Sequence, residues 1–152
     1  MEEMSLVQVG AIRRGKEGVF VEIEPAYREA LQGLEEFSHC HVLWWVSVDF
    51  GFDKRKVLSG DLPYAPGHRA GVFACRGPFR PNLIAMTVCR IKAVDAAAGR
   101  VQVTDIDAMD GTPVIDMKAY YGCCDRVQSP RQPSWLPDWG EWVPEQGIGL
   151  VQ

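Results

Sequence analysis

The fold is decided by residues 83–107, which read LIAMTVCRIKAVDAAAGRVQVTDID. Two runs rich in Val, Ile and other apolar residues, 83–94 and 100–107, flank the short segment 95–99, DAAAG. Two such runs joined by about three to five residues that include Gly are typical of a β-hairpin. The stretch therefore predicts two antiparallel strands.

Five further segments have the alternating or β-branched composition of strands: 5–12, 18–23, 39–50, 69–75 and 112–120. The polar turn 13–16 joins the first two, and the turn signal Asp110-Gly111 precedes the last. Connections of hairpin length between about seven strands indicate a mostly β, antiparallel barrel or sandwich. The βαβ alternation and glycine fingerprints of nucleotide-binding folds are absent from the sequence.

One short helix is expected after Pro25, because proline suits the first helical position. Its apolar residues fall at i, i+3, i+4 and i+7, on one face: Tyr27, Ala30, Leu31 and Leu34. The helix is expected to end within residues 33–37, and residues 51–67 are expected to form a long loop.

The segment 128–152 differs in composition from residues 1–127. It holds four prolines and three tryptophans: Pro130, Pro133, Pro137, Pro144, Trp135, Trp139 and Trp142. This composition disfavours a long helix and is too aromatic for a free linker. We therefore expect one barrel-type domain over 1–127 and a Pro/Trp-rich tail that packs on it or on a partner subunit.

The overall composition is that of a globular protein. The chain has 152 residues, of which 47% are hydrophobic and 24% charged, values that exclude wholesale disorder. The longest apolar run, 42–46, is far shorter than the roughly 18 residues needed to span a bilayer. The acidic N-terminus is not a secretory signal. We expect no membrane association and a cytoplasmic location.

Charge is spread unevenly along the chain. The net charge is −4 and the pI about 5.4, which argues against a constitutive nucleic-acid coat protein. Residues 54–92 nevertheless hold eight basic residues and one acidic residue, a net of +7, so the remainder carries −11. This asymmetry indicates an anionic ligand near residues 54–92.

Cysteine and histidine patterns do not predict a metal site. The five cysteines form no CxxC pair. Adjacent Cys123 and Cys124 could form a strained redox pair, and two reduced thiols are the simpler interpretation. His39 and His41 share a strand face and could bind a metal, but no third ligand is evident. A His39 that satisfies buried backbone groups is the alternative.

Arg76 and Arg80 lie four residues apart around the stiff turn Gly77-Pro78. A guanidinium group pairs bidentately with a carboxylate or phosphate, so two of them on a proline-stiffened loop could bind an anion. Two solvated arginines, or one paired with a local Asp, are the alternative. Asn82 could contact a ligand or stabilise the loop. Arg80 and Asn82 are thus candidate substrate contacts.

A cluster of charged side chains surrounds the Asp-Gly turn: Asp105, Asp107, Asp110, Asp116 and Lys118. At i and i+2, Asp105 and Asp107 would share one face of a strand and could bind hydroxyls, a cation or a metal. Asp110 is a standard turn residue. Asp116 and Lys118 could simply pair, although Lys118 is also a candidate substrate contact.

Three blocks of the sequence form a family pattern: GLEEFSH at 33–39, GVFACR with FRPNLI at 71–76 and 79–84, and DAMDGTPVIDMK at 107–118. In order and spacing they resemble the TrmO/TsaA family of S-adenosylmethionine-dependent tRNA methyltransferases. The family methylates N6 of the threonylcarbamoyl-adenosine beside the anticodon. Its fold is a small antiparallel β-barrel that dimerises, with the cofactor near the subunit interface. The chain resembles a short form without the longer members' C-terminal domain and without the long loop between the first two strands.

The resemblance implies S-adenosylmethionine contacts from three places: Val46 and Ser47; Arg76, with Met86 farther along; and Asp105, Ile106, Asp107 and Ala108. The cofactor offers a carboxylate for an arginine, ribose hydroxyls for a carboxylate such as Asp107, and an adenine for apolar walls. Methyl transfer depends mainly on in-line positioning. No residue stands out as a general base, and His39, Asp107 and Tyr120 are the candidates.

Three functions remain open. The first is methylation of the modified adenosine of tRNA by a homodimer, with the positive segment 54–92 against the phosphates. The second is methylation of a small molecule, motivated by the −11 outside that segment, the small size, the missing loop and a tail that could close a pocket. The third is a non-catalytic binding module on the same barrel.

Overall fold

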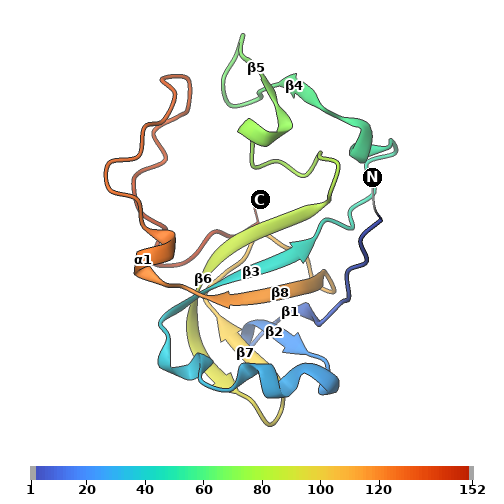
Figure 1. The fold of residues 1–152 in the computed structure, drawn as a ribbon, viewed down its shortest axis with the longest axis vertical. Helices are drawn as coiled ribbons and strands as arrows, with labels where there is room; N and C mark the ends of the chain where they lie inside the picture. Colours follow the sequence, from blue (N-terminus) through green and yellow to red (C-terminus); the bar gives the residue numbers. More distant parts are fainter. Residues whose placement is uncertain (1–2, 151–152) are drawn as a thin grey trace.

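Six strands close into an antiparallel barrel in the order β1-β2-β7-β6-β3-β8, and a separate two-stranded hairpin, β4-β5, stands beyond one end of it (Figure 1). The computed structural model describes residues 3–150. The barrel strands are β1 (Gly10–Gly15), β2 (Gly18–Ile23), β3 (His39–Trp45), β6 (Ile84–Asp95), β7 (Arg100–Val103) and β8 (Pro113–Ala119). The prediction of a mostly β, antiparallel barrel is confirmed.

The hairpin predicted from residues 83–107 forms between β6 and β7, which pair from Asp95 opposite Arg100 to Ile91 opposite Val103. β6 is 12 residues long, so it extends beyond β7 and also pairs with β3. Gly99 closes the turn with a φ of 72°, and a Cβ there would lie 2.7 Å from the Ile23 carbonyl oxygen. Glycine fits both the left-handed backbone and this close approach.

The barrel interior is filled by side chains that alternate along the strands with outward-facing ones. The largest fully buried side chains are Ile12, Val21, Cys40, Val42, Cys89, Val101, Val103, Ile106 and Val114. Burial raises the pKa of the Cys40 thiol to about 12, and that of the Cys89 thiol is also raised, chiefly by burial. Both cysteines are therefore neutral core residues at physiological pH.

The predicted helix after Pro25 is replaced by two short 3₁₀ helices, η1 (Pro25–Leu31) and η2 (Leu34–Glu36). Gly33 separates them with a φ of 84°, a left-handed conformation that a continuous helix cannot contain. Of the predicted apolar face, Leu31 is buried and Leu34 packs against the core, whereas Tyr27 is exposed. In the part of the chain described, no helix is long and apolar enough to cross a membrane.

Several predicted strands are shorter or displaced. The first begins at Gly10 rather than residue 5, and the central strand ends at Trp45 rather than residue 50. The segment predicted as a strand over 100–107 leaves the sheet after Val103, because Asp105 accepts the Ile106 N–H at 2.8 Å and turns the chain. The prediction that Asp105 and Asp107 share a strand face is therefore wrong.

The segment between β3 and β6 forms a small outlying unit. It comprises η3 (Lys54–Lys56), β4 (Ser59–Asp61), β5 (Arg69–Gly71) and η4 (Val72–Ala74). The sequence predicted a loop over 51–67, and the three-residue strand β4 within it was missed. The predicted strand 69–75 is β5 followed by η4, since Cys75 N–H bonds back to the Val72 carbonyl at 3.3 Å.

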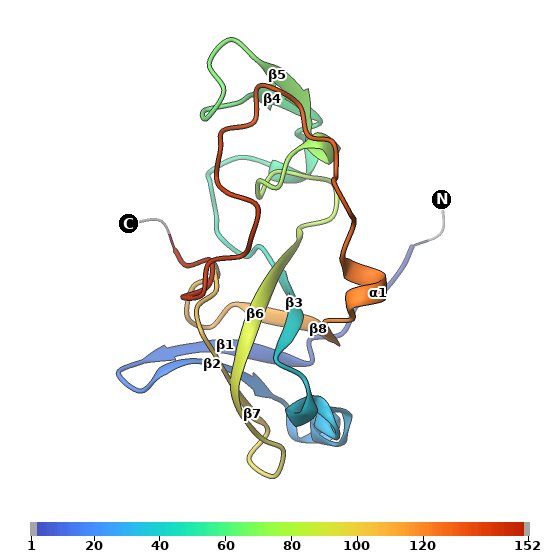
Figure 2. The same ribbon diagram turned by 90° about the vertical axis from the view of Figure 1, so that its left-hand side faces the viewer.

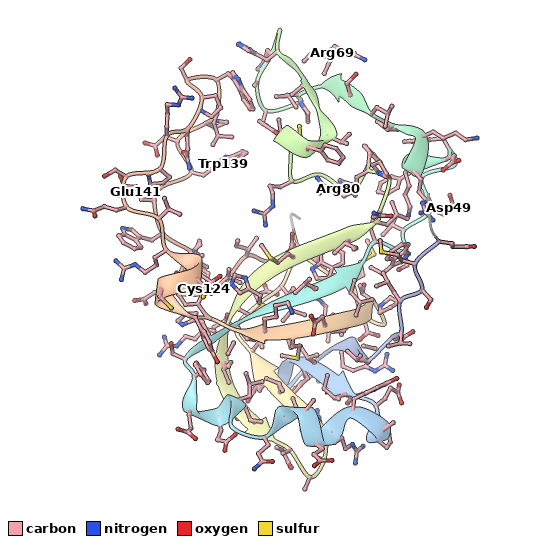
Figure 3. The ribbon with its side chains drawn as sticks, viewed as in Figure 1. Asp49, Arg69, Arg80, Cys124, Trp139 and Glu141 are labelled. Atoms are coloured by element: carbon pink, nitrogen blue, oxygen red, sulfur yellow. The ribbon has the colours of Figure 1, made fainter. Side chains whose placement is uncertain are left out.

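The tail follows α1 (Gly122–Asp125), rises beside the β4-β5 hairpin and returns to the barrel (Figure 2). Two aromatic pairs join it to the hairpin: Trp139 with Tyr64, ring centroids 5.2 Å apart, and Trp135 with His68, 6.2 Å apart. In Figure 3, Trp139 is labelled on the part of the tail that lies next to this hairpin. The tail thus contacts both units of the chain.

Candidate functional site

A pocket of about 220 Å³ opens at the end of the barrel that faces the β4-β5 hairpin. Five segments line it: the end of β3 and the residues after it, the turn 76–78, the start of β6, the loop after β7, and the tail. The lining side chains include Trp44, Val46, Ser47, Phe50, Arg76, Ala85, Asp107, Met109, Thr112 and Leu150. Apolar walls therefore surround one cation and one carboxylate.

Arg76 supplies the cation. Its side chain is exposed at the pocket wall, and its Nη2 donates to the Met86 carbonyl at 3.2 Å. The neighbouring Gly77-Pro78 turn lines the same pocket and stiffens the loop that carries Arg76. One edge of the guanidinium is thus anchored, which leaves the group oriented for a planar anion.

Asp107 supplies the carboxylate, and a buried hydroxyl orients it. The Thr87 hydroxyl donates to Asp107 Oδ1 and accepts the indole N–H of Trp44 at 3.1 Å. Trp44 and Thr87 are 8% and 3% exposed, so the bond between the indole and the hydroxyl is shielded from water, whereas the Asp107 carboxylate is exposed at the pocket. Because the Thr87 hydroxyl both accepts from Trp44 and donates to Asp107, it holds the Asp107 side chain in one rotamer that faces the pocket.

Arg14 holds the loop that carries Asp107. Its Nε donates to the Ala108 carbonyl at 2.7 Å, and its Nη2 donates to Asp105 Oδ1 at 2.9 Å and to the Ile106 carbonyl. The side chain is only 23% exposed. One guanidinium group therefore ties three positions of the 105–108 loop to β1, a role that the sequence analysis missed because Arg14 was assigned to a polar turn.

The tail forms the remaining wall. A Cβ on Gly147, whose φ is +88°, would lie 2.8 Å from the Asp105 backbone nitrogen, and a Cβ on Gly149 would lie 2.3 Å from Asp105 Oδ2. At Gly147 the neighbouring atoms belong to the backbone, so the tail can lie this close only because residue 147 is glycine, whereas at Gly149 a Cβ would require the Asp105 carboxylate to move. Leu150 follows and lines the pocket.

The structure brings together four of the residues predicted to bind a cofactor, Val46, Ser47, Arg76 and Asp107, at the pocket wall. The other four adjoin it. Met86 accepts a hydrogen bond from Arg76, and Asp105, Ile106 and Ala108 form the loop that Arg14 holds. Ile106 and Ala108 are themselves buried.

Arg80 is held differently from Arg76, although the sequence predicted that both guanidinium groups could bind an anion. Its Nε donates to the Gly77 carbonyl at 3.2 Å, and its Nη2 donates to the carbonyls of Val72 at 2.9 Å and Cys75 at 2.6 Å. Figure 3 labels it on the connection between β5 and β6. Arg80 thus holds the loop that presents Arg76, and Asn82 lies exposed in the bend that follows.

His39, Tyr120 and Lys118 lie toward the other end of the barrel. Residues 39 and 46 are separated by seven positions of extended chain, or about 23 Å at roughly 3.3 Å per residue. Lys118 pairs with Asp116 at 2.8 Å, the alternative given above, and this hydrogen bond raises the pKa of Lys118. The structure therefore does not bring these three residues to the pocket.

At that end of the barrel, His41 contacts the Asp125 carboxylate and the Tyr120 ring. His41 Nε2 lies 3.1 Å from Asp125 Oδ1, and the His41 ring stacks on Tyr120 with centroids 5.6 Å apart. Within residues 3–150, no three His, Cys, Asp or Glu side chains are grouped as metal ligands would be. These contacts join β3, β8 and α1.

A larger groove of about 450 Å³ lies between η1, η2 and β8. Its lining is mostly apolar and includes Leu31, Leu34, Phe37, Met117 and Tyr121. None of the site residues predicted from the sequence lines it, so the smaller pocket with Arg76 and Asp107 is the candidate functional site.

Comparison with known proteins gives consistent results. Residues 9–126 match the family model of the tRNA-methyltransferase O N-terminal domain. A Pyrococcus horikoshii protein described as a probable S-adenosyl-L-methionine-binding protein is 36% identical over 126 residues, which is 80% of this chain and 88% of that protein. The mouse tRNA (adenine(37)-N6)-methyltransferase is 38% identical over 104 residues, but these are 66% of this chain and 22% of the mouse protein.

Solved structures show the same relationship. The crystal structure of TrmO from Pseudomonas aeruginosa superposes with a TM-score of 0.65 at 28% sequence identity, covering 90% of this chain and 64% of that one. A second TrmO crystal structure gives a TM-score of 0.63 at 30% identity. The chain therefore spans less than two thirds of these solved relatives, and the shared part includes the barrel.

Proposed function

The chain belongs to the tRNA-methyltransferase O family, and on that premise we propose that it is an S-adenosyl-L-methionine-dependent methyltransferase that methylates N6 of the threonylcarbamoyl-adenosine beside a tRNA anticodon. The observation that carries the proposal is the pocket in which Arg76 and the oriented carboxylate of Asp107 share apolar walls. The mouse relative is named for N6 methylation of adenine 37 of tRNA, and the archaeal relative for binding S-adenosyl-L-methionine.

The donor set suits S-adenosyl-L-methionine. Arg76 can pair with its carboxylate, and Asp107, held by Thr87, can accept hydrogen bonds from ribose hydroxyls. Val46 and Leu150 offer apolar surface for the adenine. The bound cofactor supplies an electrophilic methyl group on a sulfonium. The pocket volume of about 220 Å³ is below the roughly 300–1,000 Å³ of typical ligand sites, so a ligand of this size either extends out of the pocket mouth or displaces part of the wall.

The protein's contribution to the reaction is mainly positioning. Transfer of a methyl group requires the acceptor nitrogen in line with the breaking C–S bond, and correct alignment of two reactants can account for about 7–11 kcal/mol of a barrier. Asp107 is the one carboxylate among the described residues that line the pocket. It is therefore the side chain able to accept a proton from N6 if the acceptor loses it during transfer.

Two measurements test the proposal. Isothermal titration calorimetry should detect binding of S-adenosyl-L-methionine and of S-adenosylhomocysteine. Transfer of a labelled methyl group should then occur to tRNA that carries the threonylcarbamoyl group and should be much weaker to the unmodified transcript. Cofactor binding with no methylation of either tRNA would refute the tRNA substrate, and no binding at millimolar cofactor would favour a non-catalytic binding module.

A small-molecule acceptor is the second candidate. It is favoured by the tail, whose Gly147 and Gly149 pack on Asp105 and whose Leu150 narrows the pocket. Salt separates the two candidates, because RNA binding that neutralises phosphates weakens steeply with salt concentration. A KM that is insensitive to salt between about 50 and 200 mM would favour the small molecule.

Two further parts of the proposal concern assembly and location. We also propose a homodimer as the working form and the cytoplasm as its location, with residues 1–127 as the barrel domain and residues 128–152 as a tail that packs on this domain or on the partner subunit. Sedimentation velocity at micromolar concentration should give about twice the 17.0 kDa mass of one chain. A monomer at this concentration, fully active toward tRNA, would refute the homodimer.

A further inference from the structure

Three phenylalanine rings form a cluster beside the candidate pocket. The centroids of Phe50 and Phe79 are 4.9 Å apart, those of Phe52 and Phe79 are 5.3 Å apart, and those of Phe50 and Phe52 are 6.3 Å apart. Phe50 and Phe52 follow β3, and Phe79 belongs to the loop before β6. We call these three rings the aromatic platform.

The aromatic platform is open to solvent and continuous with the pocket. Phe50 is 39% exposed and Phe52 is 52% exposed. Phe50 also lines the pocket that contains Arg76 and Asp107. Two exposed rings next to each other at the mouth of a pocket form a small apolar surface on which another molecule could pack.

Hydrogen bonds fix the loop that carries the platform. Asp49 Oδ1 accepts the Gly51 N–H at 2.8 Å, and Gly51 has a φ of 73°, so a tight turn places Phe50 and Phe52 on either side of it. Arg55 Nε donates to the Pro81 carbonyl at 2.7 Å, which ties this loop to the one that carries Phe79. The rings are thus held in position before a partner binds, which lowers the entropic cost of binding.

Basic side chains surround the rings. Lys54 Nζ lies 5.5 Å from the Phe50 ring centroid and donates to the carbonyls of Val46 and Val48. Lys56 extends into solvent, with 84% of its side chain exposed, and pairs with Asp53 at 3.4 Å. Lys54 lies against the Phe50 ring, Arg55 and Lys56 follow it in the same segment, and Arg76 lines the pocket that Phe50 also lines, against the two carboxylates Asp49 and Asp53. The surface favours an anionic partner that also has flat apolar faces.

We propose that the aromatic platform stacks an unpaired nucleobase of the RNA substrate, next to the base that enters the pocket, while Arg55 and Lys56 contact the adjoining phosphates. This inference rests on the proposed tRNA methyltransferase function and names how that substrate is held. Single-stranded loops are recognised by stacking of unstacked bases on aromatic rings combined with backbone contacts to basic residues. An apolar protein partner fits less well, because the ring edges are bordered by Lys and Arg.

The test compares Phe52→Ala with Phe73→Ala. Phe52 is chosen because it is the more exposed of the two rings after β3. Phe73 is the control, since it is an 89% exposed phenylalanine within the positive segment 54–92 but does not belong to the platform. Binding to a tRNA anticodon stem-loop is measured by fluorescence anisotropy, and KM for tRNA and the calorimetric Kd for the cofactor are measured with the same proteins.

Loss of one base–aromatic stack corresponds to a fall in affinity of about 5- to 150-fold. We expect Phe52→Ala to lower RNA affinity by about tenfold and to raise KM for tRNA similarly, with the cofactor Kd and the salt dependence unchanged. Phe52→Trp should restore affinity because it retains a stacking face. Lys56→Ala should instead reduce the slope of log affinity against log salt by about 1.

The outcomes separate the inference from the function on which it rests. If the wild-type protein methylates tRNA and Phe52→Ala binds RNA as well as Phe73→Ala does, the platform is refuted and the function stands. If Phe52→Trp fails to restore affinity while Phe52→Ala loses it, stacking is refuted. If the wild-type protein neither binds nor methylates tRNA, the function fails and the platform fails with it.

Discussion

The substitution Thr87→Val tests the hydrogen bonds that run from Trp44 through Thr87 to Asp107. Thr87→Val replaces the hydroxyl with a methyl of nearly the same size, so the core keeps its shape. The change removes the acceptor of the Trp44 N–H and the donor to Asp107 Oδ1. Because Trp44 and Thr87 are almost fully buried, water cannot readily replace the hydroxyl.

Two costs follow from the structure. An unsatisfied buried indole N–H costs about 1–3 kcal/mol. The hydrogen bond to Asp107 adds little stability because that carboxylate is exposed to solvent in the open pocket. We therefore expect a loss of about 1–2 kcal/mol in the free energy of unfolding, which lowers Tm by about 2–8 °C in a chain of this length. Asp107 also loses its fixed rotamer, and we expect the cofactor Kd to rise about five- to tenfold.

Thr87→Ser is the control. It keeps the hydroxyl and removes a buried methyl, so it should lose about 1 kcal/mol of stability while it binds the cofactor like the wild-type protein. Calorimetry gives the Kd of S-adenosyl-L-methionine, and thermal unfolding gives Tm. The reasoning is refuted if Thr87→Val binds the cofactor with wild-type affinity, or if both variants weaken binding equally, since the hydroxyl would then have no role in orienting Asp107.

Three further predictions concern other parts of the site and the core. Arg76→Ala should weaken cofactor binding by about 2–4 kcal/mol in calorimetry, because a ligand carboxylate loses its charged partner; an unchanged Kd would exclude this role. Gly147→Val places a Cβ 2.8 Å from the Asp105 backbone nitrogen at a φ of +88° and should release the tail, so that trypsin cleaves at Arg131 severalfold faster than in the wild type, whereas the neighbouring Ile148→Ala, whose side chain is 42% exposed, should not. Burial raises the pKa of the Cys40 thiol from 9.0 to about 12, so the unfolded chain loses this proton at a lower pH than the folded protein does. The free energy of unfolding should therefore fall as the pH rises from about 9 toward 12. Cys40→Ala should make urea unfolding less sensitive to pH in this range, and an equal pH dependence in both proteins would contradict the assignment.

The barrel could be predicted because its determinants are local. Two apolar runs around the segment 95–99 define a hairpin wherever they occur, and β6 and β7 form there. Strand ends were less predictable, since an apolar run does not show where pairing partners stop. The chain leaves β3 after Trp45 although the sequence stays apolar through Val46, which instead lines the pocket.

The site was predictable only where a residue acts through its own chemistry. Arg76 and Asp107 were identified because the cofactor of the family that the sequence resembles needs a guanidinium group and a carboxylate. Arg14 and Thr87 were missed because their roles depend on contacts with residues more than 90 positions away for Arg14 and 20 positions away for Thr87. For Arg80, only the folded loop shows that the carbonyls of Val72 and Cys75 use the donors of its Nη2, and a substrate contact by this residue stays a prediction.

The folded arrangement changes the meaning of the uneven charge. Most of the basic residues of the segment 54–92 lie on the β4-β5 unit and its flanking loops, beyond the pocket end of the barrel, whereas Arg90 lies opposite His39 toward the other end (Figure 1). The net −11 of the remaining chain is not confined to the other end, because Asp49, Asp107 and the tail residue Glu141 lie near the pocket end as well (Figure 3). The excess of basic residues on the β4-β5 unit and its flanking loops attracts a polyanion to this end, where the aromatic platform and Arg76 lie. Because a Debye length is about 8 Å at physiological ionic strength, this attraction acts only over the last few ångströms of approach. The acidic remainder is therefore compatible with an RNA substrate, and the association rate constant, more than the affinity of the bound base, should decrease when salt is raised.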